Sequence, residues 1–339
     1  MEPLLQPLLF SPVYKSGVWG GTRIASLPGR SGSAPFSCSE SWEISAHPSG
    51  VSVLRDGTAS LPELAARGGL VGSNAPRKDC FPLLFKIIDA AENLSVQVHP
   101  GEETAARVGG SPKTEAWFVL AAAPGAFLYA GWKPGVTRAG LERALRAGDG
   151  SVVSLLHAVP AVPGTAVTIP AGLVHALGAG CLVYEVQQSS DTTYRLYDWD
   201  RPADAGHPRP LQTEQSLETI DFSLEPPSSA EAAVIATHGA NEWRLAARTP
   251  CFELRELRLR ERETVRLQGD TFHALFVEND GGARVTAGGV SEILPRMTSC
   301  LIPAGAGSYT LEPLDAKSSL LVTSLPEGRT AQAKGVRHV

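Results

Sequence analysis

The sequence predicts a mainly β protein built from two jelly-roll barrels with a small helical insertion. The 34 glycines and 26 prolines divide the 339 residues into short segments, as expected for a turn-rich β protein. Several segments alternate apolar and polar residues, which is the period of a strand with one buried face. The tetrapeptide Ile-Pro-Ala-Gly occurs at 169–172 and again at 302–305, each time after an apolar run. A repeated strand–turn–strand block of this kind is typical of jelly rolls.

The first repeat begins with irregular chain and then gains regular elements. Residues 1–50 contain only short extended pieces around a Gly/Ser/Pro loop, and 61–69 predict a short helix that ends at glycine. Apolar or alternating runs predict strands at 82–90 and 95–100, and a strand pair around a Pro-Gly turn at 115–132. The helical insertion is predicted near 137–157, with Thr137 as its N-cap and a stop at Gly148.

Strands return after the insertion. The runs 165–177 and 181–188 are strand-like, and a helix is predicted near 213–220. From about residue 240 the pattern is strand, turn, strand up to the second Ile-Pro-Ala-Gly block, and residues 327–339 have the composition of a polar tail. The second repeat carries Ser308 near the position that His175 occupies in the first, so one repeat is expected to keep a site that the other has lost.

Composition excludes several classes of protein. The formal net charge is −5 with acids and bases interspersed, which argues against a nucleic-acid binder. No apolar run reaches membrane-spanning length, and the N-terminus lacks the basic and apolar regions of a signal peptide. The five scattered cysteines contain no Cys-x-x-Cys pair, so a reduced cytoplasmic protein is expected.

Four polar residues in the first repeat have the chemistry of metal ligands. Gln97 and His99 are two residues apart on one predicted strand and therefore share a face, Glu115 begins the next strand, and His175 follows the first Ile-Pro-Ala-Gly. Two imidazoles, a carboxylate and an amide oxygen suit zinc or another divalent first-row ion. A lone histidine on a strand is more often a surface or hydrogen-bonded residue, so ligand type alone leaves both interpretations open.

Several ordered motifs decide between these interpretations. They are Trp-Gly-Gly at 19–21, SESWEISAHPSGVS at 39–52, PLLFKIIDAAENLSVQVHP at 82–100, KTEAW at 113–117, IPAGLVHALGAG at 169–180 and YEVQQSSDTTYRLYDWDR at 184–201. Together they resemble the type I mannose-6-phosphate isomerases (phosphomannose isomerases) in their shorter bacterial form. The resemblance covers most of residues 13–222 and continues more weakly into the second repeat.

The resemblance implies a zinc-dependent enzyme of cupin fold, with one Zn²⁺ per chain, that interconverts mannose 6-phosphate and fructose 6-phosphate. It implies a catalytic cupin domain over 1–235, a degenerate cupin-like domain over 236–326 and a tail over 327–339. The site residues follow from the matching motifs: zinc ligands at His99, Glu115, His175 and Gln97, a catalytic arginine at Arg195, and pocket lysines at Lys86 and Lys113.

The residue types suggest roles in an aldose–ketose isomerisation, which moves a proton between C2 and C1 through an enediol. Arg195 can stabilise negative charge on the substrate oxygens but is a poor base. Lys113 is the first candidate for the base and a zinc-bound hydroxide is the competing one. Lys86, Ser95 and Arg195 are the expected contacts of the hexose 6-phosphate.

Two other functions stay open on the sequence. One is a metal- or sugar-binding cupin without turnover, and the other is an isomerase of a different phosphosugar. No nucleotide-binding glycine motif occurs, and we expect no nucleic-acid or membrane partner and a monomer or weak homo-oligomer.

Overall fold

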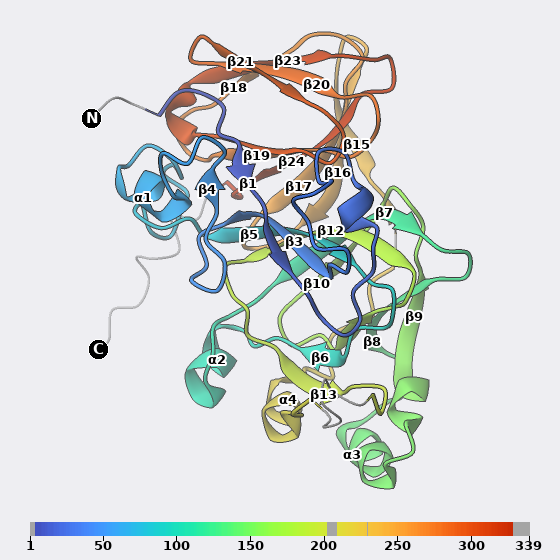
Figure 1. The fold of residues 1–339 in the computed structure, drawn as a ribbon. Helices are drawn as coiled ribbons and strands as arrows, with labels where there is room; N and C mark the ends of the chain where they lie inside the picture. The colour runs from blue at the N-terminus through green and yellow to red at the C-terminus, as the bar shows by residue number, and fades with distance from the viewer. Residues whose placement is uncertain (1–3, 202–208, 229, 328–339) are drawn as a thin grey trace, which may run out of the picture.

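The computed structural model describes residues 4–201, 209–228 and 230–327, and it is mainly β, as predicted. Four sheets stack in layers, with three helices covering the outer face of the lowest sheet in Figure 1. Apart from Glu327, the predicted tail lies outside the described residues. No helix in the described ranges is long and apolar enough to cross a membrane.

The first part of the chain supplies two sheets and a two-stranded pair. The seven-stranded sheet has the order β14 (Ala230–Glu231), β10 (Thr165–Ile169), β7 (Glu115–Ala122), β12 (Cys181–Gln188), β5 (Leu83–Asp89), β3 (Glu40–Ser45), β2 (Val13–Lys15). The five-stranded sheet has the order β13 (Tyr194–Tyr197), β6 (Val96–Val98), β11 (His175–Leu177), β8 (Phe127–Trp132), β9 (Leu156–Pro160). The separate pair joins β1 (Phe10–Ser11) to β4 (Val53–Leu54).

The second part repeats the arrangement with fewer strands. Its six-stranded sheet has the order β15 (Ala233–His238), β16 (Asn241–Arg248), β17 (Glu253–Arg258), β24 (Ser319–Ser324), β19 (His273–Val277), β22 (Ser299–Ile302). Its four-stranded sheet has the order β18 (Glu263–Arg266), β23 (Ser308–Pro313), β20 (Ala283–Ala287), β21 (Val290–Leu294). The chain changes from the first set of sheets to the second between β14 and β15, close to the predicted boundary at residue 235.

Short helices occupy the connections. They are α1 (Leu61–Ala66), α2 (Glu102–Val108), α3 (Arg138–Ala147) and α4 (Thr213–Thr219), with 3-10 turns η1 (Ile24–Ser26), η2 (Ser151–Leu155) and η4 (Ala304–Ala306). In Figure 1, α2, α3 and α4 lie below the five-stranded sheet.

The predicted helical segment near 137–157 is only partly helical. Its start is confirmed, because the Thr137 hydroxyl accepts a hydrogen bond from the backbone N–H of Gly140 at 3.2 Å. The helix ends at Gly148, and both Gly148 and Gly150 have positive φ, which breaks the helix. A 3-10 turn and strand β9 follow instead. Helix α2 was not predicted, although acidic residues open it and Gly109 closes it.

The seven-stranded sheet is buried on both faces, which explains the apolar runs in β5 and β12. One face shares a core with the six-stranded sheet, through side chains such as Phe85, Tyr184 and Phe276. The other face shares a core with the five-stranded sheet, through Val119, Leu128 and others. A strand covered on both sides reads as a continuous apolar run, so the polar residues within it stand out.

The hydrogen-bond ladders leave all four sheets open. In each half two sheets face each other across a shared core instead of closing into one ring of paired strands. The prediction of a mainly β fold is therefore confirmed, whereas two closed jelly-roll barrels are not shown.

Candidate metal centre and active site

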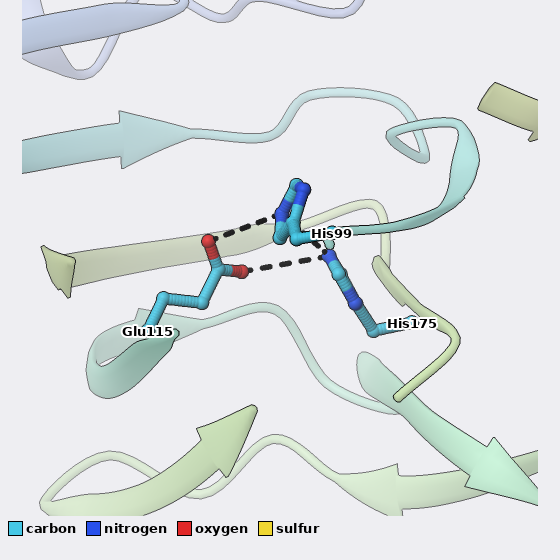
Figure 2. A group of neighbouring side chains, drawn as sticks. All are labelled: His99, Glu115 and His175. Atoms are coloured by element: carbon cyan, nitrogen blue, oxygen red, sulfur yellow. Dashed lines mark hydrogen bonds and ion pairs between the residues drawn. The ribbon is translucent and has the colours of Figure 1, made fainter. Parts of the chain in front are cut away.

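Three ionisable side chains from three separate strands meet between the two sheets of the first half. His99 directly follows β6, Glu115 opens β7 and His175 opens β11. The His99 Nε2 atom lies 3.1 Å from His175 Nε2 and 3.3 Å from Glu115 Oε2, and His175 Nε2 lies 3.5 Å from Glu115 Oε1. Figure 2 shows the two rings and the carboxylate pointing toward one another. All three are buried, and one ligand atom from each lies within 4.8 Å of the others.

The group fits a divalent cation. Both Glu115 oxygens are buried, and among the described residues Oε1 has no cation closer than the imidazole of His175 at 3.5 Å, so the carboxylate keeps acceptor capacity that a metal ion would use. The Nδ1–H of His175 can donate to the backbone oxygen of Leu173 at 2.8 Å, which leaves the Nε2 lone pair directed at the other two groups. A metal-binding histidine is usually held through its second nitrogen in this way.

Burial sets the charge of these groups in favour of metal binding. Burial, followed by the charge of Lys113, lowers the pKa of His99 to about 3. Burial also lowers the pKa of His175, against the attraction of Glu115. Burial alone would raise the pKa of Glu115, but Lys113 and His99 hold it well below its usual value. At neutral pH the site therefore offers two neutral imidazoles and one carboxylate, the forms that a metal ion requires.

Lys113 is part of this group. Its Nζ lies 2.8 Å from Glu115 Oε2, and both side chains are almost completely buried. Its position is fixed by the backbone, because the N–H of Lys113 donates to the oxygen of Pro100 just after His99. The predicted base therefore stands beside the predicted ligands.

The register of the five-stranded sheet brings Gln97 and Arg195 into the same row. His175 is directly opposite Gln97 on β6, and Gln97 is directly opposite Arg195 on β13. Residues opposite one another project from the same face, so the three side chains leave the sheet on the side of Glu115. Val96 and Val98 face the other way, into the core below the sheet, as the alternation predicted. Ser95, also buried, donates to Gln97 Oε1 at 3.3 Å.

Arg195 is half-buried and incompletely paired. Its Nη1 donates to the oxygen of Pro210 at 2.8 Å, while its buried Nε has no partner among the described residues. Burial and the nearby charge of Arg209 lower the pKa of Arg195. The guanidinium thus keeps a donor free on the face of the sheet that carries the candidate metal ligands.

A second polar row crosses the seven-stranded sheet on the same side. Lys86 Nζ lies 3.1 Å from Glu185 Oε1 and 3.4 Å from Glu40 Oε2, so two carboxylates already hold it. Burial opposes the charge on Lys86, but these carboxylates outweigh it and raise its pKa. The other oxygen of Glu185 accepts a hydrogen bond from Trp117 Nε1 at 2.9 Å, and the Trp117 ring packs edge-on against His175 at 5.5 Å.

Comparison with known proteins decides the family. Residues 8–127 match the model described as phosphomannose isomerase type I, catalytic domain. The chain is 34% identical over 289 residues to the mannose-6-phosphate isomerase of Streptococcus mutans, covering 84% of this chain and 88% of that protein. This chain belongs to the mannose-6-phosphate isomerase family. The structure of the mannose 6-phosphate isomerase of Bacillus subtilis superposes with a TM-score of 0.82 at 27% identity, covering 94% of this chain and 99% of that one.

A more distant mannose 6-phosphate isomerase, solved bound with zinc and yttrium, has the same fold. Its TM-score is 0.70 at 19% identity, and it covers 96% of this chain and all of that one. The family match thus agrees with the resemblance that the sequence motifs predicted.

Within this mannose-6-phosphate isomerase fold, the predicted residues divide into two groups. His99, Glu115, His175 and Lys113 are in contact, and Gln97 is in register beside them. The ammonium of Lys86 pairs with Glu185 and Glu40 of its own sheet. Its expected contact with the substrate phosphate therefore stays a prediction.

Trp117 and Arg209 escaped the sequence analysis. Trp117 supports a ligand ring, and its spacing of two from Glu115 was the available signal for a shared face. Arg209 donates to Asp198, which also pairs with Arg201. No local sequence pattern predicts this contact.

Proposed function

We propose that the chain is a zinc-dependent aldose–ketose isomerase that interconverts D-mannose 6-phosphate and D-fructose 6-phosphate. The observation that carries the proposal is the buried convergence of His99, Glu115 and His175 beside Lys113. Membership of the mannose-6-phosphate isomerase family supports the substrate, and zinc in a structural neighbour supports the metal. A non-catalytic binding protein would have no need to retain Lys113 and Arg195 beside this group.

We assign the metal, one Zn²⁺ per chain, to His99, Glu115 and His175, with Gln97 as the fourth ligand. When bound there, zinc supplies a Lewis acid for oxygens that become negative during the reaction. We further propose that each half is a jelly-roll unit of cupin type, with the domains at 1–235 and 236–326. A cytoplasmic monomer or weak homo-oligomer is supported by the mixed surface charge and the scattered cysteines.

The chain's own residues account for the proton transfers. For this step Lys113 acts as the neutral amine: its Nζ takes the proton from C2 of mannose 6-phosphate, and the ammonium so formed returns a proton to C1, while a proton moves from O2 to O1, so the enediol goes on to fructose 6-phosphate with all atoms balanced. Arg195 holds a positive charge next to the oxygens that become negative, and its free Nε can donate to them. Ser95 and Arg195 are the proposed contacts of the phosphate. Lys86 can contact it only if its ion pairs with Glu185 and Glu40 break.

Chelation followed by metal return tests this function. The protein stripped of metal should lose turnover of mannose 6-phosphate, and added Zn²⁺ should restore it. His175→Ala should lose both zinc and turnover, whereas His157→Ala on β9, which is two strands away from β11 in the five-stranded sheet, should keep both. A protein that binds zinc through His175 but turns over no hexose phosphate would be the non-catalytic alternative. Turnover of another phosphosugar in preference to mannose 6-phosphate would indicate the third possibility.

The enediol step has its own readout. Reaction in D₂O should place deuterium at C1 of fructose 6-phosphate, because the proton on the base exchanges with solvent. Complete retention of the original hydrogen in every turnover would contradict exchange of the base with solvent and would remove this support for the enediol step.

A further inference from the structure

The second half of the chain places a cavity where the first half places its metal ligands. The repeated Ile-Pro-Ala-Gly sets the correspondence. In the first half Ile169 is directly opposite Glu115, and in the second half Ile302 is directly opposite His273. His273 therefore occupies the position of the metal-binding glutamate.

Residues on the neighbouring strands of the two halves correspond in the same way, with no insertion between them. Lys86 on β5 is opposite Glu185, and Arg255 on β17 is opposite Val322. Both ladders have a bulge immediately after these positions, on β3 and β16. Segments 83–99 and 252–268 have equal length, so Arg255 replaces Lys86 and Gln268 replaces His99. The positive charge of Lys86 is thus retained in Arg255, while the imidazole of His99 is replaced by the amide of Gln268.

The remaining ligand positions have also changed. Gln97 is opposite His175 in the first half, and Arg266 is opposite Ser308 in the second. The positions of Gln97, His99, Glu115 and His175 are thus taken by Arg266, Gln268, His273 and Ser308. The second set contains one guanidinium, one amide, one imidazole and one hydroxyl, with no carboxylate. Because Arg266 adds a positive charge to that of Arg255, these residues do not suit a divalent metal ion.

A cavity of about 330 Å³ opens at this place. Arg255, Arg266, Gln268 and His273 line it, together with the Trp243 ring and the polar side chains of Thr264 and Ser324. A volume of this size is within the range of small-molecule sites, which combine apolar walls with a few convergent polar groups. It can take a hexose ring with one attached anionic group.

The donors at the base of the cavity are fixed in place. His273 is 93% buried, as its exposed fraction of 7% shows, and its Nδ1 lies 2.7 Å from the hydroxyl of Tyr309. When Tyr309 donates to Nδ1, the Nε2–H of His273 is the donor that remains. The buried Nε of Arg255 has no partner among the described residues, so this guanidinium also keeps a donor unused.

Acids also lie at the cavity, and Glu263 and Glu253 have partners of their own. Glu263 accepts hydrogen bonds from His238 Nδ1 at 2.8 Å and from Asn241 Nδ2 at 2.7 Å. Glu253 is shared between Arg255 and Arg248, so that cluster keeps a net positive charge. Asp270 and Glu327 also line the cavity, and Asp270 accepts from the backbone N–H of Thr271. The lining thus combines two arginines, Arg255 and Arg266, with three carboxylates, and the Nε of Arg255 is a donor still unused. Arginine favours phosphate through paired donors.

We propose that the second half is a metal-free binding site for a phosphate monoester of the size of a hexose phosphate, with Arg255, Arg266 and His273 on the phosphate and Trp243 against the sugar. The site is separate from the proposed catalytic centre and does not depend on its activity. Free phosphate shares the anionic chemistry but leaves the Trp243 wall uncovered, so a sugar phosphate should bind more tightly.

Titration of the zinc-loaded full chain with glucose 6-phosphate and with inorganic phosphate tests the proposal. Binding is followed by calorimetry and by the part of the tryptophan fluorescence change that Trp243→Phe removes. We expect a Trp243-dependent change with glucose 6-phosphate at lower concentration than with phosphate. Arg255→Leu should weaken this binding at least tenfold, whereas Arg258→Leu, on the same strand but outside the cavity, should alter it less than twofold. Turnover without added ligand should be the same in both variants.

Two results would overturn the proposal. One is a fluorescence change that is independent of Trp243 together with calorimetric binding that Arg255→Leu leaves unaltered. The other is a second zinc ion that survives His175→Ala, because the second half would then be a metal site. If Arg255→Leu does not fold, crystals of the unaltered protein soaked in tungstate, a heavy phosphate mimic, give the same decision. Density between Arg255 and His273 supports the site, and its absence there at full occupancy of other anion sites contradicts it.

Discussion

At the residue scale, the candidate centre shows how strand alternation turns sequence spacing into geometry. Gln97 and His99 could be assigned to one face from their spacing alone, and Val96 and Val98 to the other. The convergence of Glu115 and His175 on that face depends on pairing between distant strands, which only the family resemblance could supply. The contact of Lys113 with Glu115 at 2.8 Å is likewise invisible in the sequence, since spacing two along the chain does not show that both side chains are buried together.

Arg195 provides a prediction that separates catalysis from metal binding. Its side chain is in register with Gln97 but holds none of the three converging groups, so Arg195→Ala should retain zinc. Loss of a charge that faces the developing negative oxygens should reduce kcat roughly 100- to 1000-fold. Arg195→Lys should recover only part of that loss, because lysine lacks the planar set of donors. Zinc content and kcat measured on the same samples check this, and normal turnover of Arg195→Ala would remove the residue from the mechanism.

Glu278 provides a pH prediction away from the site. Burial is the main cause that raises its pKa to about 7, the charge of Glu256 adds to this, and a hydrogen bond from Ser319 opposes it. The folded state therefore keeps a proton that the unfolded state releases near 4.5. The associated stability is present below pH 4.5 and is lost as the pH rises through about 7.

Glu278→Gln replaces the ionisable carboxyl with a neutral amide, so the folded state no longer needs a bound proton at this position. Relative to the unaltered protein, the variant should therefore be more stable at pH 8 than at pH 5, which urea titrations show as a larger free energy of unfolding at pH 8. Glu214→Gln, an exposed change on α4, should give the same difference at both values. An equal effect of Glu278→Gln at pH 5 and pH 8 would show that the carboxyl ionises normally in the fold.

At the element scale, β5 and β12 show why a polar residue inside an apolar strand carries information. Both strands are covered by a core on each face, yet they place Lys86 opposite Glu185. The two side chains are 7% and 4% exposed, so each compensates the buried charge of the other. A pair of this kind is costly to break but is not necessarily a net source of stability.

Lys86→Met should accordingly destabilise the protein by about 3–5 kcal/mol, because it leaves Glu185 and Glu40 without their cation. The double change Lys86→Met with Glu185→Leu should be less destabilising than Lys86→Met alone, since one of the unpaired charges is removed. Urea unfolding of the two single variants and the double variant measures the coupling between the residues. Additive losses would mean that the two charges act independently.

The helices mark the limit of local patterns. The start of α3 at Thr137 and its stop at Gly148 were both predicted, but the remainder of the predicted helical segment to 157 is not α-helical, because Gly148 and Gly150 take positive φ. Val152 and Val153 then join a 3-10 turn that leads into β9. Helix α2 was missed although its acidic first turn and Gly109 are helix signals, and although α1 and α4, which are as short, were predicted.

At the scale of the whole molecule, the two halves share one core. The seven-stranded and six-stranded sheets pack through Phe85, Tyr184, Phe276 and other side chains, with the Tyr184 and Phe276 rings stacked at 4.1 Å. A polar contact reinforces the junction, because the buried guanidinium of Arg30 binds Glu43 at 2.8 Å and donates to the backbone oxygen of Met297 at 3.0 Å. The repeat in the sequence predicted two similar halves, but nothing in it indicated how much surface they bury against each other.

A shared core of this extent should make the two halves unfold together. Separation would expose the Phe85 and Phe276 faces to water at about 25 cal/mol for each Å² of apolar surface, so neither half should be stable alone. Calorimetry of the zinc-loaded chain should therefore show one transition, and chelation of zinc in the first half should lower the unfolding temperature of the second half equally. The Trp243 fluorescence, obtained as the difference from Trp243→Phe, reports on the second half, and the metal site reports on the first. If chelation lowered the first transition and left the Trp243 signal unchanged, the halves would be independent units, and the junction at Arg30 would be a contact without thermodynamic coupling.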